Sequence, residues 1–201
     1  MNRFIRFSLF SVIFTVSLPV FGWAQDATVS ESSASETSST DEQVSPRDAV
    51  EPGQPYDRET FGDWTLRCIR NDSANEPCQL YQLLKDEEGN SVAEITLFPL
   101  PVGQRAEAGA TVAVPLETLL TRQLTIQVDS ASPRRYPFSW CTVQGCYARI
   151  GFRAEDVLAF KRGANAFVSI VPLAAPNQTV DLNMSLIGFT AGYNALRDSR
   201  G

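Results

Sequence analysis

The sequence of 201 residues contains no histidine. Ser-His-Asp and Cys-His catalysis both depend on an imidazole base, so these two classes of enzyme are excluded. A zinc site built from histidine and cysteine would lack half of its ligands. The chain also lacks a Gly-Lys-Ser/Thr triplet after "GQRAEAG", so no phosphate-binding loop is predicted at Gly103. These absences lead us to expect no catalytic residue, no bound metal and no cofactor.

The first 24 residues have the features of a secretory signal peptide. Arg3 and Arg6 form a charged start, an apolar run follows over residues 7–23, and small residues stand at Gly22 and Ala24. Cleavage is predicted after Ala24. The alternative is an uncleaved anchor helix, but the apolar run is at the lower edge of the length of a membrane span. We therefore expect contact with a membrane only through this transient leader.

Residues 25–55 are rich in Ser, Thr, Asp and Glu and contain few large apolar residues. Such a composition cannot bury enough apolar surface to offset the entropy of ordering, which predicts a disordered acidic linker. The segment carries most of the acidity of the chain, and residues 56–201 are close to neutral. A near-neutral domain gives no electrostatic reason to expect nucleic acid as a partner.

Residues 56–201 are predicted to form one domain of short strands. "FGDWTLRCIR" alternates between apolar and polar residues, as a half-buried strand does, and turn signals separate several similar runs. "RAEDVLAFKRG" has acids early and bases late, which suits a short helix, and "AGYNALRD" predicts a final helical turn. The pattern predicts an all-β, mostly antiparallel β-sandwich of about eight or nine short strands with one or two short helices.

Four cysteines lie in this domain, and each pair flanks a predicted loop. Cys68 and Cys78 flank "NDSANEP", and Cys141 and Cys146 flank the hairpin loop "TVQG". Four cysteines allow three pairings, and the local one fits both loops. A thioredoxin-type pair has two intervening residues and not four, and export favours oxidised cysteines over a zinc site. The domain is therefore predicted to be stapled by disulfides.

The stretch "RRYPFSW" contains a candidate interaction surface. Arg134, Arg135 and Tyr136 could stack on bases or sugars. The near-neutral charge favours a different interpretation, a strand with an arginine-rich approach and buried rings that include Trp140. Trp64, on the alternating strand, is predicted to be a core residue.

Four stretches occur in an order that resembles one known family. They are "FGDWTLRC", "CQLYQLL", "WCTVQGCYARIGF" and "LNMSLIGFTAGYNAL". This set resembles the invasion-associated locus B family of bacterial exported proteins over roughly residues 58–197. The resemblance implies a periplasmic or outer-envelope β-sandwich of a Gram-negative bacterium, with Cys68, Cys78, Cys141 and Cys146 matching the paired cysteines of the family. It supplies no catalytic residues, and the family name comes from members tied to host-cell entry.

The sequence therefore favours an exported protein that binds an envelope or host protein, with a possible part in invasion or adhesion. Two alternatives stay open, an envelope enzyme based on thiol-disulfide or carboxylate chemistry and a purely structural envelope component. A binding protein is expected to expose an apolar or aromatic patch. An enzyme is expected to have a concave pocket with convergent carboxylates of shifted pKa. A structural component is expected to pair through its edge strands.

Overall fold

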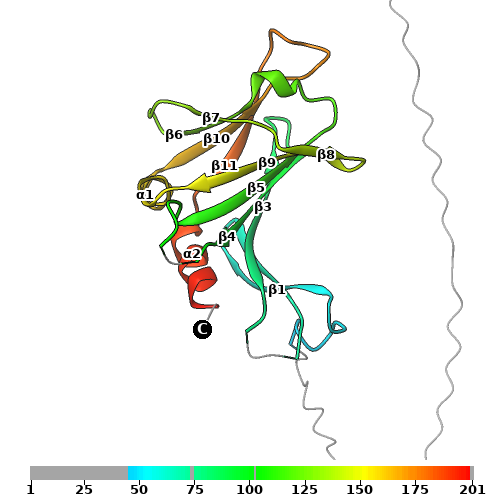
Figure 1. Cartoon of the computed structure of the whole chain (residues 1–201), viewed down its shortest axis with the longest axis vertical. Coiled ribbons are helices and arrows are strands. Elements are labelled where there is room, and N and C mark those ends of the chain that lie inside the picture. Colours follow the sequence, from blue (N-terminus) through cyan, green and yellow to red (C-terminus); the bar gives the residue numbers. More distant parts are fainter. Residues whose placement is uncertain (1–44, 73–74, 102, 200–201) are drawn as a thin grey trace, which may run out of the picture. The chain divides into compact units, whose positions relative to one another are not determined.

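The structure is a computed structural model that describes residues 45–72, 75–101 and 103–199 (Figure 1). The expected signal peptide and residues 25–44 of the expected linker lie outside these ranges. The described residues contain eleven strands, two α-helices and one 3-10 helix. The strands are β1 (Pro55–Phe61), β2 (Trp64–Ile69), β3 (Cys78–Lys85), β4 (Ser91–Pro99), β5 (Ala108–Val114), β6 (Leu124–Val128), β7 (Arg134–Tyr136), β8 (Trp140–Thr142), β9 (Gly145–Phe152), β10 (Asn165–Ile170) and β11 (Val180–Ser185). The helices are η1 (Leu120–Arg122), α1 (Ala154–Arg162) and α2 (Phe189–Asp198).

The strands form one antiparallel sheet in the order β7-β6-β10-β11-β3-β4-β5-β9-β8. Strand β3 also pairs with β2, which carries β1, while the end of β3 meets β11 through Lys85 and Asn183. The sheet curls so far that Tyr136 of β7 packs edge-on against Phe152 of β9, with ring centroids 6.2 Å apart. The all-β expectation is confirmed, but the form is a curled half-barrel and not a clear sandwich, because one sheet bends round instead of two sheets stacking.

The inner face of the curled sheet holds the core. Side chains alternate along each strand, so residues such as Ala93, Ile95 and Leu97 of β4 are buried while their neighbours face outward. Helices α1 and α2 cover one end of this core with aromatic rings. Trp64 lies fully buried there, edge-on to Phe189 at 5.3 Å, which confirms it as a core residue.

Both predicted helical segments form helices. In α1 the acids stand in the first turn and the bases in the last, and the Asp156 carboxylate accepts a hydrogen bond from the Arg153 backbone N–H at 2.9 Å. This arrangement suits the helix dipole. α2 begins after Gly188, which has a φ of 83°. A Cβ at Gly188 would lie 1.9 Å from the carbonyl oxygen of Phe61, so only glycine fits where α2 starts against β1.

The folded part of the chain extends further toward the N-terminus than residue 56. Residues 45–54 form turns, and β1 begins at Pro55. The Arg47 guanidinium donates to the Asn71 carbonyl at 3.0 Å, and Gly53 N–H donates to the Arg70 carbonyl at 2.7 Å. The expected linker boundary is therefore wrong for residues 45–55. The composition of these residues did not predict that they fold, because polar contacts, rather than apolar burial, hold most of them in place.

The sheet has two distinct ends. One end of the sheet lies near α1 and α2, and we call it the helix end (Figure 1). β5, β9 and β10 each have one terminus there. At the opposite end, which we call the loop end, lie residues 115–123, 143–144 and 171–179. None of the helices within the described ranges has the length and apolar character needed to span a membrane.

Candidate functional site

Two disulfides bridge neighbouring strands. Cys68 is joined to Cys78 across β2 and β3, and Cys141 to Cys146 across β8 and β9. In both cases the two cysteines are direct cross-strand partners with Cα atoms 4.0 Å apart. This is the local pairing that the sequence predicts. Among the described residues no cysteine is free, and no group of three or more potential metal ligands comes together.

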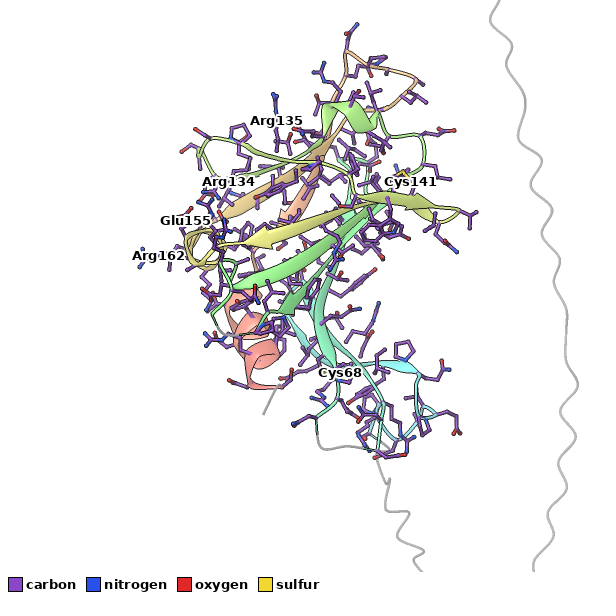
Figure 2. The ribbon with its side chains drawn as sticks, in the orientation of Figure 1. Cys68, Arg134, Arg135, Cys141, Glu155 and Arg162 are labelled. Atoms are coloured by element: carbon purple, nitrogen blue, oxygen red, sulfur yellow. A yellow bond between two sulfur atoms is a disulfide. The ribbon has the colours of Figure 1, made fainter. Side chains whose placement is uncertain are left out.

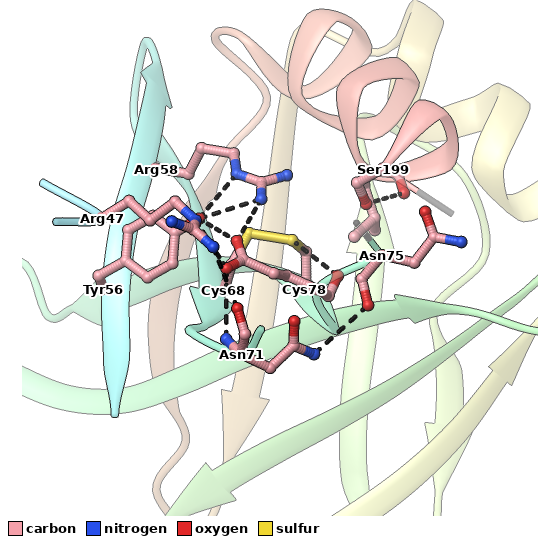
Figure 3. Close-up of a disulfide and its surroundings, with 10 residues drawn as sticks. Arg47, Tyr56, Arg58, Cys68, Asn71, Asn75, Cys78 and Ser199 are labelled. Atoms are coloured by element: carbon pink, nitrogen blue, oxygen red, sulfur yellow. Dashed lines mark hydrogen bonds and ion pairs between the residues drawn. A yellow bond between two sulfur atoms is a disulfide. The ribbon is translucent and has the colours of Figure 1, made fainter. Parts of the chain in front are cut away.

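A buried carboxylate, that of Glu76, lies close to the first disulfide, since the Glu76 carbonyl oxygen is 3.4 Å from the Cys78 sulfur. Figure 3 shows the side chains of Arg47, Tyr56 and Arg58 that gather beside this disulfide. Glu76 is 4% exposed and accepts hydrogen bonds from the Tyr56 hydroxyl, from Arg58 at 2.5 Å, from Arg47 at 2.9 Å and from the Asn71 backbone N–H at 3.3 Å. These donors, with the Tyr56 hydroxyl first, lower the pKa of Glu76 to about 2. A carboxylate that is ionised and fully occupied by neighbours suits a structural role. The cluster fixes residues 45–54 and the β2–β3 loop to β1.

The structure separates the three residues of the predicted interaction surface (Figure 2). Arg134 turns toward α1 and forms ion pairs with Glu155 at 3.2 Å and with Asp156 at 2.5 Å. Tyr136 is half-buried at the edge of the core. Only Arg135 is exposed without an ion pair that the described residues supply. Arg134 and Tyr136 hold the closing edge of the sheet and do not form a stacking platform with Arg135.

An exposed aromatic pair stands instead on the β8–β9 hairpin. The Trp140 and Tyr147 rings are stacked with centroids 5.1 Å apart and an interplanar angle of 11°. Trp140 is 42% exposed, so the expectation that its ring is buried is wrong. The reason is the alternation of side chains. Cys141 and Cys146 point to one face of the hairpin, and their outer neighbours Trp140 and Tyr147 point to the other. In the sequence, Trp140 directly precedes Cys141 and Tyr147 directly follows Cys146. This spacing is the signal from which the exposed aromatic pair could have been predicted.

The aromatic pair ends a row of side chains that crosses the outer face of the sheet. The register aligns Leu83, Glu94, Ala113, Tyr147 and Trp140 on successive strands from β3 to β8. A groove of about 420 Å³ follows this row. Its walls are mainly apolar and include Leu83, Val92, Val114, Pro115, Gln144 and Tyr147, while Glu94 is the charged residue among them. The groove offers apolar contact area and lacks the converging carboxylates that hydrolysis would need.

Comparisons with known proteins point to one family. A family model described as invasion associated locus B (IalB) protein matches residues 64–197. Two invasion protein B homologs of Brucella abortus, from strain 2308 and from biovar 1 strain 9-941, are each 26% identical over 140 residues, which cover 70% of this chain and 79% of the relative. The crystal structure of invasion associated protein B from Bartonella henselae aligns with a TM-score of 0.58 at 20% identity, over 70% of this chain and 95% of that chain. The last match supports the all-β fold.

Proposed function

Because the chain belongs to the invasion-associated locus B family, we propose that it is an exported envelope protein that acts by binding a partner and not by catalysis. Its site is the outer-face groove together with the Trp140–Tyr147 stack. The stack is the observation that carries the proposal, since a ring 42% exposed on a disulfide-braced hairpin adds little to the core. Exposed aromatic side chains in a firm setting are typical anchors of binding surfaces.

The proposal includes export to the periplasm or the outer envelope. Arg3, Arg6 and the apolar run of residues 7–23 support an export signal. Two disulfides support an oxidising compartment, where such bonds persist. The partner that we propose is an envelope or host protein. A part in host-cell entry rests on the names of the family and of the Brucella relatives.

The two alternatives are less well supported. The carboxylate whose pKa is lowered to about 2, Glu76, is buried among its own donors and does not line the groove. A purely structural component would pair through an edge strand, but β7 and β8 have only three residues each, and the longer edge β1 carries the charged side chains Asp57, Arg58 and Glu59. Short edge strands and charged side chains on an edge are both common means of limiting edge-to-edge pairing.

A crosslinking pull-down with matched variants tests the proposal. The bait is the natively exported chain, incubated with the envelope fraction or with host-cell surfaces, and captured proteins are identified by mass spectrometry. Replacing both rings in W140A/Y147A should reduce capture of the specific partner by about thirtyfold, the effect of losing one aromatic hot spot.

The control variant is F167A. Phe167 of β10 is 40% exposed, nearly as much as Trp140, but it lines a different groove with Gln127 and Asn183. Its loss should leave capture unchanged. Equal capture by W140A/Y147A and the wild type would refute the assignment, and loss of capture in F167A alone would move the site to that second groove.

A further inference from the structure

The loop end exposes aliphatic side chains from three separate segments. Leu116 is 52% exposed, Leu120 39%, Val143 87% and Leu173 58%. Leu116 and Leu120 lie between β5 and β6, Val143 is at the tip of the β8–β9 hairpin, and Leu173 follows β10. These four residues, which we call the aliphatic tips, lie on three loops that the fold brings to the loop end of the sheet.

Two of these segments are held against each other by the backbone. Thr118 and Pro172 form an isolated β-bridge. Leu119 N–H donates to the Val171 carbonyl and Leu173 N–H to the Glu117 carbonyl, both at 2.7 Å. The leucines of these segments are thus presented outward on a fixed base. Single exposed apolar side chains are normal on protein surfaces, so the informative feature is that several of them are grouped at one end of the sheet.

Few charges surround the aliphatic tips. Residues 143–144 and 171–179 contain none, and residues 115–123 contain only Glu117 and Arg122. Arg135 adds a second cation nearby, because it is the cross-strand partner of Thr125 at the start of β6, and Figure 2 shows it on the η1 side of β7. No ion pair among the described residues occupies Arg122 or Arg135. Asp181 of β11 lies in the same cross-strand row as Arg135, through Ser169 and Thr125. The loop end therefore combines projecting aliphatic groups with two guanidinium groups and two carboxylates, Glu117 and Asp181.

This combination suits a lipid surface better than a protein partner. Leucine and valine are under-represented among the hot spots of protein interfaces, where tryptophan, tyrosine and arginine dominate. Aliphatic groups that stand apart on several loops can each enter the acyl boundary of a bilayer. Nearby cations then gain from anionic headgroups within a Debye length.

We propose that the loop end is a lipid-contacting surface that places Leu116, Leu120, Val143 and Leu173 in the interface of an anionic bilayer. Arg122 and Arg135 contact the lipid phosphates in this arrangement. The contact is peripheral and separate from the leader, and it differs from the sequence-based expectation that only the leader meets a membrane. It is also independent of partner binding at Trp140 and Tyr147, so either proposal can fail alone.

Vesicle cosedimentation of the exported chain tests this proposal. The vesicles are pure phosphatidylcholine in one series and equal parts of phosphatidylcholine and phosphatidylglycerol in the other. The wild type should bind the anionic vesicles more tightly. L116D/L173D should lower the partition coefficient at least about tenfold, because a buried leucine side chain contributes an energy of that order. R122A/R135A should bind the anionic vesicles no better than the neutral ones.

The matched control is I187D. Ile187 is 68% exposed and lies between β11 and α2 at the helix end, so its replacement should leave vesicle binding unchanged. All variants share the same N-terminus, so any contribution from residues 1–24 is common to them. L116S/L173S serves as the second test variant if the aspartates impair folding, which circular dichroism would reveal.

Three results would overturn the proposal. The first is absence of wild-type binding to either vesicle type, and the second is equal binding by the wild type and both leucine variants. The third is a dimer of the exported chain in light scattering that the leucine variants dissociate, because the aliphatic tips would then cover a second copy of this chain. A lower partition coefficient for L116D/L173D with an unchanged one for I187D supports it.

Discussion

Removing the two disulfides one at a time should affect different properties of the protein. The variants are C68A/C78A and C141A/C146A. The bridged cysteines are 10 and 5 positions apart in sequence. On the chain-entropy model, loops of this length give a stabilisation of roughly 2.7 and 2 kcal/mol, because the closed loop restricts the unfolded chain. Loop length alone therefore predicts similar losses for the two variants.

The positions of the disulfides separate the two cases. β2 and β3 lie inside the sheet, so the first disulfide cannot open without disturbing the core. C68A/C78A should lower the Tm by roughly 5–10 °C, as expected for about 2.7 kcal/mol in a domain of this size. β8 is an edge strand with three residue pairs. Without the Cys141–Cys146 disulfide, β8 can fray in the native state. The native state then gains conformational entropy as well as the unfolded state, and the Tm should therefore fall less than in C68A/C78A.

The local effect of C141A/C146A should appear at Trp140. Its stack on Tyr147 depends on the hairpin, so the variant should show greater quenching of Trp140 by iodide and weaker partner capture while the rest of the domain stays folded. Thermal unfolding by circular dichroism and quenching below the transition measure the two effects. A Tm loss for C141A/C146A equal to or larger than that for C68A/C78A would refute the reasoning, as would unchanged quenching of Trp140.

Three further predictions concern stability. The pKa of Glu76 is lowered from 4.5 to about 2, so this carboxylate contributes stability above pH 4.5 that is lost as the pH falls through 2; acid titration of E76Q should show a weaker pH dependence in that range. R134A should destabilise the domain by on the order of 1 kcal/mol in urea unfolding, and R135A by much less, because only Arg134 pairs with the buried Asp156. G188A should destabilise by about 2 kcal/mol or more, or prevent folding, since the new Cβ would collide with β1; expression of a folded variant with an unchanged Tm would contradict this.

Local patterns in the sequence predicted the parts of the fold that depend on neighbouring residues. The alternation in "FGDWTLRCIR" located β2 and placed Trp64 in the core. The loops between the cysteines predicted both disulfides because each joins strands that follow one another. The predicted strand count was too low, since β1 has few apolar residues and residues 134–142 contain two strands, β7 and β8, and not one. Pro137 separates them, and proline cannot donate to a sheet.

Features that depend on distant residues could not be predicted. The strands form one curled sheet because the end of β3 pairs with β11, about a hundred positions later in the sequence. No local sequence pattern predicts this pairing. The partners of Arg134 lie on α1, so the sequence showed a basic stretch where the fold has an ion pair. The loop end brings Leu116 and Leu173 together through the bridge between Thr118 and Pro172, and each leucine alone is unremarkable in the sequence.

The Cys141–Cys146 disulfide is best understood as a device that presents side chains. β9 is held in the sheet by its pairing with β5, but β8 is attached only to β9, through three residue pairs at the edge. Such a segment would not hold an aromatic stack in a fixed position without a crosslink. Stability of the domain does not require the stack, because polar residues at Trp140 and Tyr147 would suit the outer face of an edge strand equally well. A braced hairpin that keeps an exposed tryptophan against a tyrosine therefore supports the proposed binding role of this face more than a role in completing the fold.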